Sequence, residues 1–125
     1  MFKDKVVVVT GGVKGIGKCI AEEFEKAGAK VCIIDILDNP YFAGDIAKAK
    51  VLQDFANKVI AEHGKVDILV NNALPFMKGI DSCTFEEFNH ALKVGVTAPF
   101  YLAKLFLPYF AEGASIINMS SSRDR

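Results

Sequence analysis

Residues 6–17 read VVVVTGGVKGIG, a run of four valines that leads directly into a glycine-rich turn. An unbroken run of β-branched residues is typical of a central strand in a parallel sheet that is covered on both faces. Ile16, Ile20 and Phe24 then recur at helical spacing, and Gly28 suits a helix C-terminus. Val31 to Ile34 repeats the buried-strand pattern. This part of the chain therefore predicts a strand, helix, strand unit with a right-handed crossover.

Three glycines, Gly11, Gly15 and Gly17, lie at the junction between the first strand and its helix. Missing side chains let the backbone approach a pyrophosphate, and the free N–H groups of the helix N-terminus would face its oxygens. Asp35 ends the second strand, 18 residues after Gly17, where a carboxylate can accept hydrogen bonds from ribose hydroxyls. The alternative is a simple glycine-rich turn and a surface aspartate. The order of strand, turn, helix, strand and acid favours dinucleotide binding.

The segment after Asp35 predicts a long helix and a further strand. Leu52, Phe55 and Val59 share one face of the helix, and residues 66–70 have the buried-strand pattern. Only residues 36–40 separate Asp35 from Tyr41, fewer than the dozen or so that a parallel crossover needs. We therefore expect residues 41–43 to be loop or a short antiparallel extension, not a parallel strand.

The last third of the chain predicts two helices and a final strand. Thr84 and Glu87 form a capping box at the start of the first helix. Its apolar residues, expected to face inward, are Phe85, Phe88 and Leu92. Residues 97–109 are apolar nearly all round, which is typical of a helix buried on more than one side. Residues 115–119 indicate a buried strand.

Composition excludes several classes of function. The chain has 125 residues, enough for one domain, which we interpret as a single dinucleotide-binding half domain over residues 1–125. Its 15 Lys and Arg balance 15 Asp and Glu, so nucleic acid is not an expected partner. No apolar run reaches the roughly 18 residues of a membrane span, and no signal peptide is evident. We expect a cytoplasmic protein that does not bind membranes.

Cysteine and histidine do not indicate a metal site. The three cysteines, Cys19, Cys32 and Cys83, are scattered through apolar patterns and are interpreted as buried thiols. His63 and His90 have no ligand partner nearby in sequence, so we expect them to be surface or capping residues.

The chain resembles the short-chain dehydrogenase/reductase family over essentially its whole length. Residues 10–17 match the TGxxxGxG loop of that family, and residues 71–73 match the start of its NNAG signature. Residues 115–121, SIINMSS, resemble the strand that carries the catalytic serine, which would be Ser121. The resemblance implies a doubly wound fold, a bound NAD(H) or NADP(H), and hydride transfer between a carbonyl and an alcohol.

The resemblance also implies binding roles for single residues. Gly11, Gly15, Ile16 and Gly17 would surround the pyrophosphate, and Asn72 belongs to the NNA motif. Asp45 matches the family residue that contacts adenine. Because the segment before it is short, a position of Asp45 away from the adenine site is the alternative. Lys14 stands where NADP-preferring relatives often have a basic residue, whereas Asp35 would repel a 2′-phosphate. We therefore expect NAD(H) rather than NADP(H).

Four departures from the family pattern limit what the resemblance implies. No tyrosine has a lysine four positions later, so the YxxxK acid and its partner are missing. Gly95 stands in the place of the relay asparagine, and Leu74 in the place of the NNAG glycine. The helix between the second and third strands has no residues to build it. We expect a truncated Rossmann-like sheet of order 2-1-3-4, flavodoxin-like, with the usual third strand displaced or absent.

These observations support two functions. The first is an NAD(H)-binding oxidoreductase-family protein without autonomous hydride transfer, since Ser121 lacks its partners. The second is a homo-oligomeric scaffold or regulatory protein with a vestigial nucleotide site. A truncated product of a longer gene is a third possibility. We expect a homodimer through the helix at residues 99–109, which packs between subunits in the resembled family, or through the strand at residues 115–119, an unpaired edge.

Overall fold

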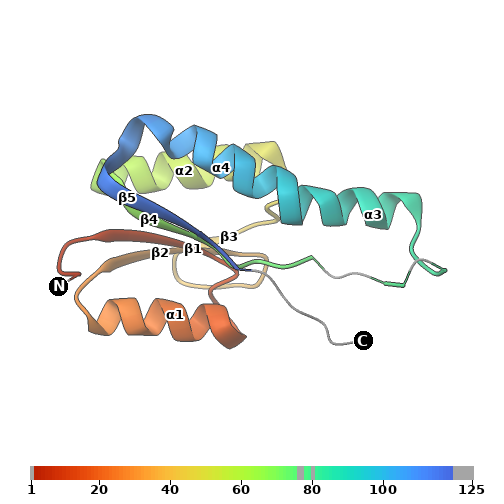
Figure 1. Cartoon of the computed structure of the whole chain (residues 1–125), viewed down its shortest axis with the longest axis horizontal. Helices are drawn as coiled ribbons and strands as arrows, with labels where there is room; N and C mark the ends of the chain where they lie inside the picture. The colour runs from red at the N-terminus through yellow and green to blue at the C-terminus, as the bar shows by residue number, and fades with distance from the viewer. Residues whose placement is uncertain (1, 76–77, 80, 120–125) are drawn as a thin grey trace.

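The computed structural model describes residues 2–75, 78–79 and 81–119. Within them, parallel strands form a single sheet in the order β3-β2-β1-β4-β5 (Figure 1). The strands are β1 (Val6–Thr10), β2 (Lys30–Asp35), β3 (Phe42–Ala43), β4 (Val66–Asn71) and β5 (Phe110–Asn118). Helix α1 (Gly15–Lys26) covers one face, and α2 (Ala49–His63) and α4 (Ala98–Phe106) cover the other. The predicted Rossmann-like α/β fold is confirmed.

Strand β1 lies inside the sheet because both of its faces are apolar. Val6 and Val8 join a core with Phe55, Leu102 and other residues of α2 and α4. Val7 and Val9 point to the opposite face, where Phe24 and other residues of α1 pack against them. All four valines are at most 2% exposed. The predicted central strand is confirmed, as is the inward face of α2, where Leu52, Phe55 and Val59 are buried.

Strand β3 corrects the prediction for residues 41–43, because it pairs with β2 in parallel. Phe42 lies opposite Ile34 and Ala43 lies opposite Asp35, so β3 meets only the last two residues of β2. A strand this short needs no crossover over the face of the sheet, and the chain doubles back at one edge. The Asn39 side chain organises this turn: its Oδ1 accepts from the N–H groups of Tyr41 and Phe42 at 2.9 Å. The third strand is therefore neither absent nor antiparallel.

Residues 85–109 form one continuous helical segment rather than two separate helices. α3 (Phe85–Leu92) continues through a π-helical turn (Lys93–Thr97) into α4, and a 3₁₀ turn (Leu107–Tyr109) follows. The capping box at Thr84 is confirmed by both of its hydrogen bonds. Among the helices of the described residues, none combines the length and apolar character that a membrane span requires.

The predicted inward face of α3 is wrong. Its three large apolar residues are 76%, 47% and 42% exposed; they are Phe85, Phe88 and Leu92. Figure 1 shows the reason, because α3 extends beyond the carboxyl end of the sheet and has no strand beneath it. The buried residues of this segment are instead Ala91 in α3 and larger residues such as Leu102 and Phe106 in α4.

Strand β5 is an edge of the sheet, as predicted, but it is not the buried strand expected from its composition. It pairs with β4 on one side, and Ile116 and Ile117 are 47% and 41% exposed. Successive residues of a strand point to opposite faces, so both faces of β5 are open among the described residues. The apolar composition of β5 predicts burial, but a strand is buried only where neighbouring elements cover it.

The cysteines also differ from the prediction of three buried thiols. Cys32 in β2 is buried, Cys19 is exposed and Cys83 is half-buried. Burial raises the pKa of the Cys32 thiol to about 11, although a hydrogen bond with Tyr41 acts in the opposite direction. Cys32 is therefore a neutral packing residue.

Candidate functional site

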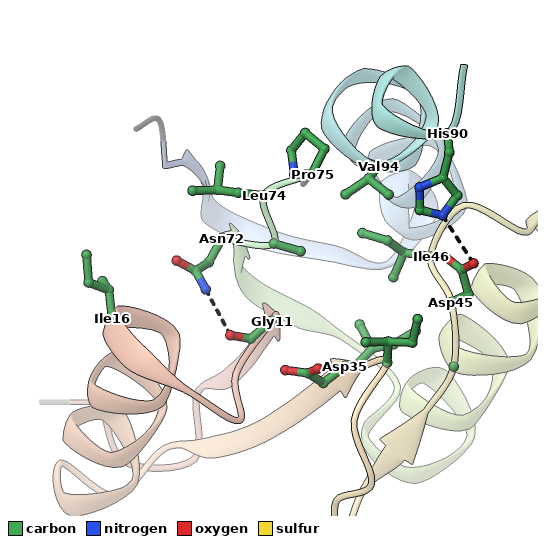
Figure 2. Close-up of a pocket in the computed structure, with 14 residues that line it drawn as sticks. Gly11, Ile16, Asp35, Asp45, Ile46, Asn72, Leu74, Pro75, His90 and Val94 are labelled. Carbon is green, nitrogen blue, oxygen red and sulfur yellow. Dashed lines mark hydrogen bonds and ion pairs between the residues drawn. The ribbon is translucent and has the colours of Figure 1, made fainter. Parts of the chain in front are cut away.

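A cavity of about 390 Å³ opens at the carboxyl ends of β1, β2 and β4 (Figure 2). The chain leaves β1 for β2 on one side and later places β4 on the other, so the strand order reverses here. Ligands of open α/β sheets bind in the crevice at such a switch point. The lining residues are Gly11, Ile16, Ile34, Asp35, Ile36, Gly44, Asp45, Ile46, Asn72, Ala73, Leu74, Pro75, His90 and Val94.

The glycine-rich turn brings the backbone of α1 against the end of β1. A Cβ atom on Gly17 would overlap with the Gly11 carbonyl oxygen and the Asn72 side chain, so this approach requires glycine. Gly11 and Gly15 have φ values of +68° and +58°, which also favour glycine. The α1 N-terminus has no capping side chain and no acidic residue in its first turn. Its free N–H groups and positive dipole end suit an anion such as phosphate.

Polar contacts tie this turn to the residues after β4. The Thr10 hydroxyl accepts hydrogen bonds from the backbone N–H groups of Asn72 and Ala73, both at 3.0 Å. The Asn72 side chain in turn donates to the Gly11 carbonyl oxygen at 2.9 Å. Asn72 therefore holds the turn in place, and its side-chain nitrogen is already engaged within the protein.

Asp35 lies at the end of β2 with its carboxylate at the cavity. One oxygen accepts from the Val13 N–H at 3.1 Å and the other from the Leu37 N–H at 3.0 Å. These two backbone donors fix the orientation of the carboxylate, and each carboxylate oxygen can accept a further hydrogen bond. The spacing of Asp35 from the glycines thus predicts its position correctly.

Asp45 follows β3 and lines the same cavity, so β3 brings it to the site instead of displacing it. Its carboxylate accepts from the Ala47 N–H at 2.9 Å and lies 3.3 Å from Nε2 of His90 in α3. Burial acts to raise the pKa of Asp45, but these two contacts outweigh it and hold the pKa below its ordinary value. The His90–Asp45 contact joins α3 to the β2–β3 edge (Figure 2).

The structure brings most of the predicted binding residues together. Gly11, Ile16, Asp35, Asp45 and Asn72 line the cavity, and Gly15 and Gly17 stand beside it in the turn. Lys14 is an exposed residue outside the lining. The proposed catalytic Ser121 lies outside the described residues.

Sequence reasoning missed the wall opposite the glycine turn. Ile46, Val94 and His90 line it, and none belongs to a motif. The spacing of His90 and Val94, four residues apart in one helical segment, was the available signal for a shared face. Gly95 lies in the π-helical turn, and a Cβ atom there would be 3.5 Å from Cγ of Pro75.

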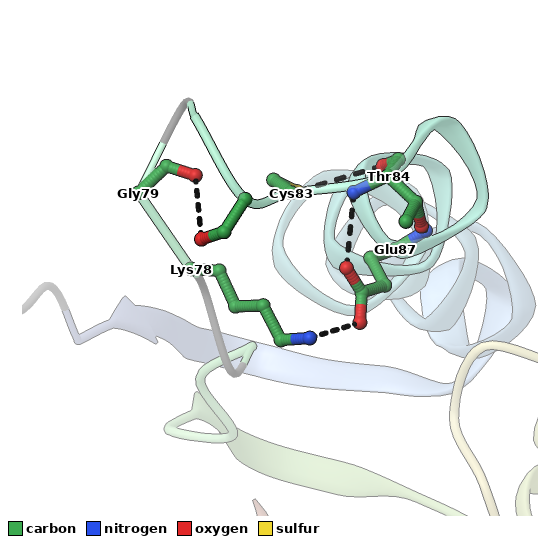
Figure 3. Close-up of polar contacts among 6 residues, drawn as sticks. Lys78, Gly79, Cys83, Thr84 and Glu87 are labelled. Atoms are coloured by element: carbon green, nitrogen blue, oxygen red, sulfur yellow. Dashed lines mark hydrogen bonds and ion pairs between the residues drawn. The ribbon is translucent and has the colours of Figure 1, made fainter.

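A second polar cluster anchors the loop that follows the cavity wall (Figure 3). Lys78 Nζ lies 2.8 Å from Oε2 of Glu87, and Oε1 of Glu87 accepts from the Thr84 N–H at 3.0 Å. The Glu87 contact raises the pKa of Lys78, and Lys78 lowers that of Glu87. Glu87 therefore serves both the capping box of α3 and the loop before it.

Fold and cavity together define a Rossmann-like α/β protein with its pocket at the switch point. The family model for short chain dehydrogenase matches residues 5–124. The chain therefore belongs to the short-chain dehydrogenase/reductase family, as the sequence motifs indicate.

Known relatives agree with this assignment. An uncharacterized oxidoreductase of Thermotoga maritima is 33% identical over 98% of this chain and 56% of its own length. An apo SCOR enzyme from Clostridium thermocellum has a TM-score of 0.86 at 38% identity, covering 94% of this chain and 54% of that one. A metagenomic short-chain oxidoreductase in complex with NADP has a TM-score of 0.87 at 29% identity, covering 97% and 63%. The chain spans about half the length of the curated relatives it matches.

The close approach at Gly17 yields a prediction for stability. The Gly17→Ala variant should lose about 1–3 kcal/mol of unfolding free energy, because the added methyl group meets fixed backbone at Gly11. Gly79→Ala is the matched control, since no atom lies within 4 Å of a Cβ at Gly79, and it should change stability by less than about 0.5 kcal/mol. Urea denaturation measures both. Equal stabilities of the two variants would contradict the proposed crowding at Gly17.

Proposed function

We propose that the chain binds NAD(H) in the switch-point cavity. The observation that supports the proposal is that the uncapped N-terminus of α1 and the fixed carboxylate of Asp35 lie at the same cavity. The first suits the pyrophosphate, and the second suits the adenosine ribose hydroxyls. Asn72 and the glycine turn would hold the phosphate-binding backbone in place. When bound, the nicotinamide ring supplies a hydride acceptor or donor.

Asp35 also supports NAD(H) over NADP(H). Its carboxylate would repel a 2′-phosphate, whereas the basic residue of the turn, Lys14, lies outside the cavity lining. One structural neighbour was solved in complex with NADP, so the preference for NAD(H) proposed here rests on Asp35 alone.

We propose that this chain does not carry out hydride transfer on its own. Two of the three tyrosines have hydroxyls engaged away from the cavity: the Tyr41 hydroxyl donates to Glu62, and the Tyr101 hydroxyl accepts from Gln53. The third, Tyr109, lies in the 3₁₀ turn after α4. None of them lines the cavity, so no phenol is available there to move a proton to or from a substrate oxygen. Gly95 likewise offers no side chain at the position of the relay asparagine.

We also propose that the protein is cytoplasmic.

The second proposal is self-association, and exposed apolar side chains support it. The helical segment carries six of them, here called the α3–α4 patch: Phe85, Phe88, Leu92, Val96, Phe100 and Leu107. Their spacings of three, four or seven residues are typical of one helix face. Exposed apolar patches mark interaction sites on soluble proteins. A symmetric homodimer would bury the same patch on both copies. This patch also favours the scaffold alternative, in which association is the function.

Nucleotide binding is tested by calorimetric titration with NADH. Asp35→Ala should weaken NADH about tenfold or more, because hydrogen bonds to a charged group are lost, and should reduce the preference over NADPH. Asp38→Ala changes an exposed acid in the loop that follows Asp35; it is the matched control and should bind normally. Gly15→Leu should abolish binding, because its side chain would fill the open space at the start of α1. Circular dichroism must show that this variant folds, since the φ of +58° at Gly15 strains any other residue. Unchanged affinity in both site variants would refute the proposed site.

Catalysis is tested by following NADH formation from NAD⁺ with a panel of secondary alcohols and sugars. Loss of general acid–base catalysis typically lowers a rate by about 10² to 10⁴, so we expect no measurable turnover. Turnover within the ordinary enzyme range of about 1 to 10³ s⁻¹ would contradict the proposal.

Association is tested by light scattering at micromolar concentration, where we expect the mass of two chains. Phe106→Glu is unsuitable as a probe because Phe106 is fully buried in the core. Phe100, which is 64% exposed in the α3–α4 patch, is the suitable position, and Phe100→Glu should yield monomer. Ile36→Glu, at a residue 67% exposed outside the patch, should remain dimeric. A monomeric unmodified chain would exclude the dimer.

A further inference from the structure

The two ends of the cavity are lined by different kinds of side chain. Its charged or titratable side chains are two carboxylates and one imidazole, from Asp35, Asp45 and His90. Apolar residues such as Ile46 and Val94 form the wall between them. Hydroxyl and amino groups suit the carboxylates, and a planar ring suits the apolar wall, so this part of the cavity fits a neutral nucleoside. Phosphate belongs beside it, at the uncapped N-terminus of α1.

The other end of the cavity carries apolar side chains without an ionisable group. Ile16 and Leu74 are 64% and 52% exposed and border this end. In Figure 2 the Leu74 side chain points to the side on which Asn72 and Ile16 lie, away from Asp45 and His90. A ligand that extends from the phosphate site along this end of the cavity meets the Ile16 and Leu74 side chains, because both line it.

Leu74 is also held in place by its neighbours. A residue before proline is confined to extended backbone, so Pro75 restricts where the Leu74 side chain can go. Pro75 in turn lies against the π-helical turn, with its ring 3.5 Å from the position of a Cβ on Gly95. The two residues before Leu74 are fixed as well, because the Asn72 and Ala73 N–H groups both donate to Thr10. Backbone movement therefore cannot easily withdraw this side chain.

We infer that the site selects an adenosine diphosphate unit, and that Leu74 is a specificity-determining residue that limits entry of the second nucleotide. A cavity of about 390 Å³ lies near the lower end of the roughly 300–1,000 Å³ of ligand sites, which fits part of a dinucleotide better than all of it. The inference rests on the proposed nucleotide function. It adds that the nicotinamide half contributes little to affinity.

The experiment compares ADP with NADH by calorimetry on the full chain. We expect the two dissociation constants to agree within about fivefold, and the NADH fluorescence to keep its free emission maximum because the nicotinamide stays in water. Leu74→Ala should tighten NADH at least about fivefold relative to ADP, and should shift the emission of bound NADH. Leu37→Ala shortens another exposed leucine that neither lines the cavity nor belongs to the α3–α4 patch, and it keeps the backbone N–H that donates to Asp35, so it should leave the ratio unchanged.

The outcomes separate this inference from the proposed function. A preference of the unmodified chain for NADH of more than about fivefold would overturn the inference and leave nucleotide binding intact. An unchanged ratio in Leu74→Ala would remove the assigned role of Leu74. If neither ADP nor NADH binds, the proposed function fails, and the inference fails with it.

Discussion

The four valines of β1 are buried on both faces of the strand, and the arrangement of the site at the carboxyl end of the sheet depends on this burial. A strand covered on both faces needs a neighbour on each side, and here β2 and β4 supply them. The reversal of strand order between these neighbours creates the crevice. Thr10, at the end of β1, then accepts two hydrogen bonds from the segment after β4 and so ties these two walls of the crevice together. Core packing and site geometry are thus set by one strand.

The crevice uses the backbone and side chains for different tasks. Backbone N–H groups at the start of α1 are left free for an anion, and the missing side chain of Gly17 allows the close approach that places them. Carboxylates at the ends of β2 and β3 provide directional acceptors. The pairing of β3 with β2 matters here because it brings Asp45 beside the site without a crossover helix. His90 then connects that edge to α3.

Local pattern predicted the features that local physics controls. The central strands, the α2 face, the Thr84 capping box and the position of Asp35 followed from apolar periodicity and spacing. Features that depend on distant neighbours did not. Phe85 and Phe88 have the same apolar character as core residues, yet no strand lies under α3. The parallel pairing of β3 depends on the turn that Asn39 organises. The cavity wall at Ile46 and Val94 depends on tertiary packing, which no sequence motif marks.

The separation of the two β1 pairings also has a consequence for how the chain folds. β1 and β2 are roughly two dozen residues apart, whereas Thr10 and Asn72 are 62 positions apart. Closing the longer loop costs about 0.8 kcal/mol more chain entropy, and non-local pairing slows folding. Chain entropy therefore favours contacts within the β1–α1–β2 unit over the pairing of β1 with β4 as the first to form. Until β4 pairs with it, the far edge of β1 is an unpaired apolar strand, and unpaired strand edges of this kind promote aggregation.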